Sequence, residues 1–178
     1  MFLNILYPMK ILPRSLAASL LVLLPVFSSA QTPQTRPLAA EARQFDFWLG
    51  EWEVFGPDGT VGGHSRIESI AEGHALLENW TDADGSSGKS LNVYNDRKKQ
   101  WQQFWVGSST PILELSGGLQ NGAMVLSGSH TTVAGETMLD RITWTPQADG
   151  TVRQHWEGSR DAGKTWKVNF DGIYKHKK

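Results

Sequence analysis

The stretch FDFWLGEWEVFG, Phe45 to Gly56, places three Phe and two Trp within twelve residues. Gly50 divides it into two parts with different spacing. Before Gly50, apolar residues recur at helical spacing: Leu38, Ala42, Phe45 and Leu49. After Gly50, the segment EWEVF alternates with the period of a strand. The stretch therefore predicts a short N-terminal helical turn, a stop at Gly50 and a first β-strand.

Alternating apolar and polar residues continue through the rest of the chain. The expected strands are 51–55, 64–73, 74–82, 89–96, 100–107, 112–119, 123–131, 136–145, 151–159 and 165–175. Turn sequences such as DGT, QNG and PQADG separate them. Short connections favour antiparallel neighbours, and closure removes the exposed edges of a long meander. We predict an all-β fold, an antiparallel up-and-down meander of about ten strands closed into a barrel. A β-sandwich is the alternative.

The first thirty residues have the pattern of a secretory signal. Lys10 and Arg14 supply positive charge, Ser15–Phe27 is apolar, and small residues lead to Ala30. The apolar run is shorter than the roughly 20 residues that span a bilayer, although a retained anchor is the alternative. We expect cleavage near Ala30 and a periplasmic or secreted protein. Residues 31–37 are then a flexible leader, and residues 38–178 form a single β-barrel domain.

Charge and cysteine content narrow the expected partners. Loss of Lys10 and Arg14 with the signal would change the formal net charge from −1 to −3. No basic stripe remains, so we expect neither a nucleic-acid partner nor stable membrane insertion after cleavage. The chain has no Cys, which rules out disulfides, Cys-based catalysis and thiolate metal sites.

The aromatic stretch has two interpretations in a barrel. Phe45, Trp48 and Leu49 can close one end of the barrel with apolar surface, while Trp52 points inward from the first strand. Alternatively, Phe47 and Trp48 form part of a ligand-binding wall. We favour the structural plug.

Gly50-Glu51-Trp52 resembles the Gly-x-Trp signature of the calycin superfamily, which includes lipocalins, fatty-acid-binding proteins and nitrobindin-like haem barrels. With ALLENW, LNVYNDRKKQWQQFWV and FDGIYK, it resembles a family of exported bacterial proteins of unknown function over Phe45 to Lys175. The resemblance implies a calycin-like barrel and no particular reaction. Lipocalins place an Arg late in the barrel against the signature Trp, whereas Lys175 stands in the matching region here.

Short motifs give no catalytic residue and no metal site. The segment SRDAGKTW, Ser159 to Trp166, fits the Asp-box pattern, which predicts a hairpin held by Asp161, Gly163 and Trp166. The five His lack the paired spacing of a zinc site. We predict no cofactor, but a single axial His suffices for haem, so haem bound through His155 is kept open.

Aromatic and polar side chains on the strands suggest a ligand-binding set, and the alternative is that the charged strand face is simply solvated. Its members are Glu78, Trp80, Gln103, Trp105, Arg141, Trp144 and His155. The leading hypothesis is an exported barrel that binds a small, largely apolar molecule. The alternatives are a calycin-type isomerase or hydrolase that uses Glu78, Arg141 or His155, and an interaction protein whose barrel is filled.

Overall fold

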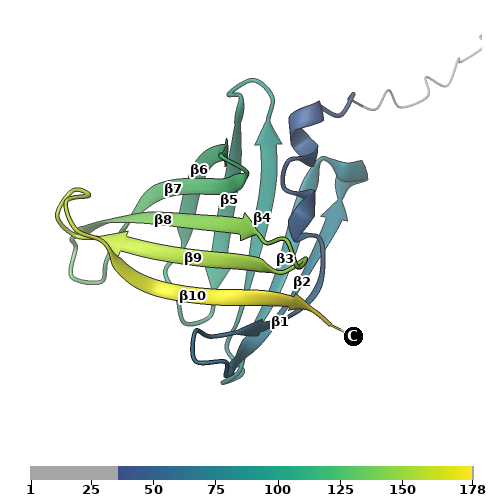
Figure 1. Cartoon of the computed structure of the whole chain (residues 1–178). Coiled ribbons are helices and arrows are strands. Elements are labelled where there is room, and N and C mark those ends of the chain that lie inside the picture. The colour runs from purple at the N-terminus through teal and green to yellow at the C-terminus, as the bar shows by residue number, and fades with distance from the viewer. Residues whose placement is uncertain (1–35, 178) are drawn as a thin grey trace, which may run out of the picture. The chain divides into compact units, whose positions relative to one another are not determined.

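Ten antiparallel strands close into a barrel over residues 36–177, the part of the chain that the computed structural model describes (Figure 1). The predicted signal, 1–30, and most of the predicted leader, 31–37, lie outside the described residues. Among the described residues no helix has the length and apolar character needed to cross a membrane.

Each strand pairs with the next one along the chain, and β1 pairs with β10 to complete the closure. The strands are β1 (Gly50–Phe55), β2 (Val61–Ile70), β3 (Ala75–Asp82), β4 (Ser87–Asn95), β5 (Gln100–Gly107), β6 (Leu113–Gln120), β7 (Ala123–Thr131), β8 (Thr137–Pro146), β9 (Val152–Ser159) and β10 (Lys167–His176). The predicted meander and barrel are thus confirmed, and the architecture is consistent with a calycin-like fold.

The turn between β6 and β7 shows how local sequence sets the register. Gln120 pairs with Ala123, which leaves only Asn121 and Gly122 in the loop. Both have positive φ, 50° and 83°, as a type I′ turn requires. The QNG signal therefore fixes this hairpin without help from the rest of the fold.

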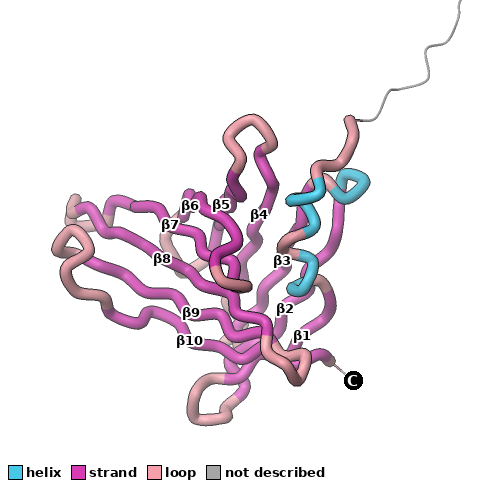
Figure 2. The backbone as a smooth tube through the Cα atoms, turned by 45° about the horizontal axis from the view of Figure 1, so that its top comes forward, coloured by secondary structure: helices cyan, strands magenta, loops and turns pink. Residues whose placement is uncertain are grey.

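One end of the barrel is closed by two short 3₁₀ turns, η1 (Ala40–Arg43) and η2 (Asp46–Trp48), shown in cyan in Figure 2. A third such turn, η3 (Ala71–Gly73), joins β2 to β3. The buried residues of η1, η2 and their junction are three apart, Ala42, Phe45 and Trp48, which matches three residues per 3₁₀ turn. The predicted helical face was therefore partly wrong, since Leu38 is exposed and Leu49 only half-buried.

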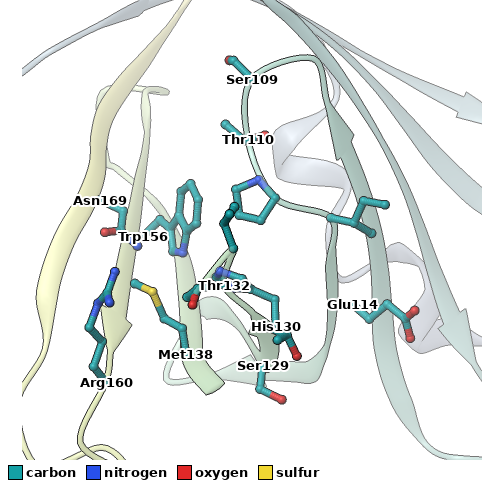
Figure 3. A pocket seen from close by; sticks show the side chains of 14 residues that line it. Ser109, Thr110, Glu114, Ser129, His130, Thr132, Met138, Trp156, Arg160 and Asn169 are labelled. Atoms are coloured by element: carbon teal, nitrogen blue, oxygen red, sulfur yellow. The ribbon is translucent and has the colours of Figure 1, made fainter. Parts of the chain in front are cut away.

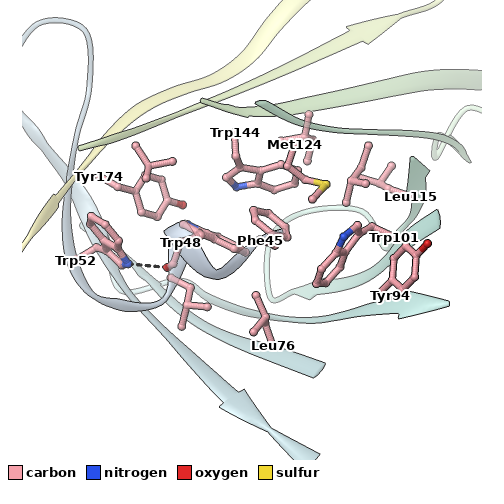
Figure 4. Packing of buried hydrophobic residues seen from close by; sticks show 14 of the residues in the cluster. Phe45, Trp48, Trp52, Leu76, Tyr94, Trp101, Leu115, Met124, Trp144 and Tyr174 are labelled. Carbon is pink, nitrogen blue, oxygen red and sulfur yellow. Dashed lines mark hydrogen bonds between the residues drawn. The ribbon is translucent and has the colours of Figure 1, made fainter. Parts of the chain in front are cut away.

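The aromatic side chains of these turns fill the base of the barrel (Figure 4). Phe45 stacks on Trp48, with ring centroids 4.9 Å apart. Phe45 also meets Trp101 and Trp144 edge-on, at 5.6 and 5.2 Å. Trp52 is buried from β1, and its indole N–H donates to the Trp48 carbonyl oxygen at 2.9 Å. The stretch that opens the fold is accordingly a structural plug.

The closing strand adds a second contact to Trp52. His176 pairs with Trp52 across β1 and β10, and the two rings stack with centroids 3.7 Å apart. Lys175, which stands where lipocalins have an Arg, instead lies over the Phe55 ring at 4.5 Å. A cation–π contact does form here, but with Phe55, three residues beyond the signature Trp on β1.

Candidate ligand-binding site

A small chamber of about 100 Å³ lies inside the barrel at the end opposite the helical turns. Its position follows from two lining residues, Asp82 at the end of β3 and Thr110 just beyond the end of β5. Five residues of the expected set line it: Glu78, Trp80, Gln103, Trp105 and Trp144. We call this open end the mouth and the plugged end the base.

Glycines create the space in which the two wall tryptophans of the mouth lie. A Cβ at Gly63 would come 2.7 Å from the Trp80 ring, and one at Gly88 would overlap the Trp105 ring. The rings can therefore lie flat against the backbone of the neighbouring strand. Trp105 is held further by its indole N–H, which donates to the Thr110 hydroxyl at 2.8 Å.

A chain of buried hydrogen bonds runs along the inner wall from Glu78 to Gln103. The Glu78 carboxyl accepts from the hydroxyls of Ser65 at 3.2 Å and Ser90 at 2.8 Å. The Asn92 amide donates to Ser90 at 2.9 Å and accepts from Gln103 at 2.7 Å. Because all five side chains are buried, this network is a costly feature that a merely filled core does not need.

Burial raises the pKa of Glu78 from 4.5 to about 7, although the two serine hydroxyls lower it in part. Tyr174, also in the chamber wall, has its pKa raised well above 10 by burial and by the nearby Glu78 charge. Near neutral pH the Glu78 carboxyl is therefore divided between its protonated and ionised forms. It can act as a hydrogen-bond donor or acceptor toward a small polar group.

The chamber wall also holds a donor with no partner. Trp144 is buried, and its indole N–H has no hydrogen-bond acceptor among residues 36–177. Gln154 and Tyr174, which the sequence did not single out, line the chamber and bond to each other at 2.5 Å. Buried polar groups normally have partners, so the enclosed Trp144 N–H is an unsatisfied donor next to the chamber.

Arg141 and His155 do not line the chamber, and for these two residues the expected placement was wrong. Arg141 lies on the outer face, 3.0 Å from Glu157 and 4.2 Å above the Trp166 ring. His155 lies on the same outer face, 3.4 Å from Asp171. Successive strand residues face opposite sides, so Arg141 cannot share a face with Trp144. His155 accordingly does not face the interior in which a haem was considered.

A larger pocket of about 1000 Å³ opens beside the chamber and shares Thr110 and Trp156 with it (Figure 3). It forms because β6 and β7 separate toward the mouth, where their pairing ends at Leu115 and Gly128. The segment 109–112 then forms one side of the pocket and residues 129–133 the other. We call this the side pocket.

A histidine and a buried aspartate meet at the side pocket. His130 Nδ1 lies 2.6 Å from one Asp140 oxygen, and the Trp156 indole N–H donates to the other at 2.9 Å. Asp140 has no exposed surface, whereas His130 lines the pocket. This pair was not among the site residues expected from the sequence. The available signal was Asp140, an acid on the same strand face as Ile142 and Trp144.

The Asp-box segment forms the expected hairpin beside the mouth. Asp161 accepts from the Thr165 backbone N–H at 2.9 Å and from the hydroxyls of Ser159 and Thr165. These bonds lower the pKa of Asp161 to about 2. Gly163 has φ 87°, and the Trp166 indole N–H donates to its carbonyl. The motif is structural here.

Within the described part of the chain, no group of three or more His, Asp or Glu side chains is placed to hold a metal ion. No family model matches the chain, and no curated protein matches it at a significant level. The function is therefore inferred from the geometry of the mouth.

Proposed function

We propose that the protein binds a small, largely apolar molecule that carries one hydrogen-bonding group. The observation that supports this most is the chamber itself, where aromatic walls meet the buried network of Glu78 and Gln103. Ligand sites in proteins typically combine apolar walls with a few placed polar groups. The architecture, a barrel open at one end, is the one in which calycin-like proteins hold ligands.

The two cavities differ in volume, so each suits a different part of the proposed ligand. The chamber of about 100 Å³ has room for a small polar head, while the side pocket of about 1000 Å³ accommodates an apolar body. Small-molecule sites usually measure roughly 300–1,000 Å³, so the chamber alone is too small for a whole ligand. A head held by Glu78, with its body along Trp156, uses both spaces.

The protein is further proposed to act outside the cytoplasm, as a single barrel domain released from its signal. Lys10, Arg14 and the apolar run Ser15–Phe27 support this, as does the resemblance to an exported bacterial family. N-terminal sequencing of protein from its own host should find a start at or near Gln31. A folded protein that retains Met1 in the membrane fraction contradicts export.

Ligand binding is tested by tryptophan fluorescence titration with an anilinonaphthalene sulfonate probe, fatty acids of increasing length and haem. Trp105→Ala and Glu78→Gln should each weaken binding by about tenfold or more, or about 1.4 kcal/mol. Two neighbours supply matched controls that should leave binding unchanged. Phe104→Ala alters the adjacent outward ring on β5, and Arg141→Met removes a charge from the outer face.

Two results would contradict ligand binding at the mouth. One is that no compound binds below about 1 mM, a weak affinity of about −4 kcal/mol. The other is that Phe104→Ala weakens binding as much as Trp105→Ala, which places the probe on the outside of the sheet.

The second of these outcomes would favour an interaction protein with a filled barrel. Leu91, Phe104 and Val106 are all more than 40 % exposed on β4 and β5. Leu91 and Phe104 are direct cross-strand partners, so they form a continuous apolar stripe on the outer surface.

A further inference from the structure

The side pocket contains a histidine oriented by a buried acid, an arrangement that ligand binding in the chamber does not require. Asp140 has no exposed surface and accepts two hydrogen bonds, from His130 Nδ1 at 2.6 Å and from the Trp156 indole at 2.9 Å. Burying a carboxylate is costly even when it is paired, and replacing such pairs by apolar residues is often neutral or stabilising. Stability alone is therefore a weak reason for this pair.

The geometry determines which imidazole nitrogen is available. Nδ1 is occupied by Asp140, so the neutral ring carries its proton on Nδ1 and leaves Nε2 as the acceptor. Nε2 has no hydrogen-bond partner among the described residues, and His130 lines the side pocket. An acid that holds Nδ1–H and a free Nε2 is the orienting half of a hydrolytic triad.

We propose that His130 is a general base that activates water for the hydrolysis of a carboxylic ester with an apolar acyl chain. Water is the nucleophile because the chain has no Cys and no Ser or Thr hydroxyl bonds to His130 in residues 36–177. The apolar side chains of Ile112, Val133 and Met138 line the pocket and suit an acyl chain. This inference does not rest on ligand binding by the chamber.

The step balances with water as the only co-reactant. Nε2 of His130 takes a proton from water while the water oxygen bonds to the ester carbonyl carbon. The carbonyl carbon becomes tetrahedral, and its oxygen becomes an oxyanion. The carbon–oxygen bond to the alcohol then breaks, and Nε2 returns its proton to the leaving oxygen. The products are a carboxylic acid and an alcohol.

The charged groups around His130 come from several elements. Asp140 on β8 touches the ring, Glu114 on β6 and Arg160 after β9 line the pocket, and Glu136 before β8 pairs with Arg160 at 2.6 Å. Of these four groups, only Asp140 is in contact with the imidazole ring.

The test is hydrolysis of p-nitrophenyl esters with acyl chains of two to twelve carbons by the full chain. His130→Gln should lower the rate by about 10²-fold or more, the usual contribution of a general base. His155→Gln, which removes an outward-facing histidine from β9, is the control and should leave the rate unchanged.

Asp140→Asn separates an orienting role from a structural one. The amide still accepts from Trp156, but it donates to Nδ1 and moves the ring proton to Nε2. Hydrolysis should then fall by about 10²-fold or more, about as far as in His130→Gln, because a ring with its proton on Nε2 cannot act as the base. Long-range ¹H–¹⁵N correlation spectra should show the proton on Nδ1 in the wild type and on Nε2 in Asp140→Asn.

Two outcomes overturn the proposal. One is that no ester in the series is cleaved faster by the wild type than by His130→Gln. The other is a wild-type spectrum with the neutral proton on Nε2. If Asp140→Asn does not fold, the wild-type spectrum and the comparison of His130→Gln with His155→Gln still decide the matter.

Discussion

The base and the mouth of the barrel use inward-facing aromatic side chains in opposite ways. At the base, Phe45 and Trp48 pack directly against Trp144, with centroids 5.2 and 5.4 Å away. At the mouth, Trp80 and Trp105 are only half-buried and face a chamber. The same strands thus carry a filled core at one end and an open site at the other.

Polar groups divide in the same way. At the base, the Trp48 indole N–H is buried without a partner in the described fold, and no polar network accompanies it. At the mouth, Glu78, Ser90 and Gln103 belong to one bonded chain. The packed rings of the base stabilise the fold, whereas the buried polar groups of the mouth can bond a ligand but lower the stability.

The largest expected difference is between tryptophans at the two ends. Trp48→Ala should lower the free energy of unfolding by about 3–5 kcal/mol, because the ring has no exposed surface and leaves a cavity. Trp52→Ala should lose a similar amount. Trp105→Ala should lose less than about 2 kcal/mol, because one side of its ring already faces open space. Urea unfolding measures all three.

An equal loss for Trp48→Ala and Trp105→Ala would show that the two ends are packed alike. A loss below about 1 kcal/mol for Trp48→Ala would show that the helical turns do not close the base in solution.

The next largest effect is the pH dependence of the free energy of unfolding, which depends on Glu78 at the mouth. The pKa of Glu78 is 4.5 ordinarily and about 7 in the fold, so the folded protein keeps a proton that the unfolded chain releases. Unfolding free energy should therefore fall as pH rises from 4.5 to 7, by about 3 kcal/mol for this one group, and then level off. Glu78→Gln should remove this slope, so the free energy of unfolding of the variant should increase relative to that of the wild type as pH rises.

Chemical denaturation at pH 5, 6, 7 and 8 measures the slope. Asp161, whose pKa is lowered to about 2, acts only below pH 4 and does not overlap this window. An unchanged slope in Glu78→Gln would mean that water or another group already compensates the buried carboxyl.

The smallest expected change in stability concerns Gly88, whose missing side chain leaves room for the Trp105 ring. Gly88→Ala should cost about 1–3 kcal/mol by overpacking, since the new Cβ overlaps the Trp105 ring. Gly118→Ala on β6 is the control, because nothing lies within 4 Å of the added Cβ. Thermal unfolding compares the two, and a displaced Trp105 should also shift the fluorescence spectrum. Equal stability for both variants would mean that the ring moves freely within the mouth.

Most of the fold could be predicted because its signals are local. Alternation and turn dipeptides identified all ten strands, and the Asn121–Gly122 turn fixed one register outright. The helical turns were less predictable. The spacing of Leu38, Ala42, Phe45 and Leu49 fits an α-helix, whereas the residues that are buried, Ala42, Phe45 and Trp48, are three apart as in a 3₁₀ turn. Only the packing of Phe45 and Trp48 into the barrel selects the second spacing.

The site was only partly predictable, for two physical reasons. Parity correctly groups Glu78 with Trp80, and it equally places Arg141 on the opposite strand face from Trp144, which is why Arg141 lies outside the chamber. The His130–Asp140 pair needs more than parity. Gly128 pairs with Asp140, so His130 reaches the acid diagonally across two strands, and that register is visible only once the hairpin is built.

The pairing of β1 with β10 has a consequence for how the barrel forms. Every other strand pair joins neighbours in sequence, so those hairpins need only short loops to close. Matching Trp52 with His176 instead brings together the two ends of the described fold, which costs chain entropy that short hairpins avoid. Such non-local pairing raises contact order and slows folding. The aromatic plug lies beside the β1–β10 pair. We therefore expect the base to be the last part of the barrel to form during folding.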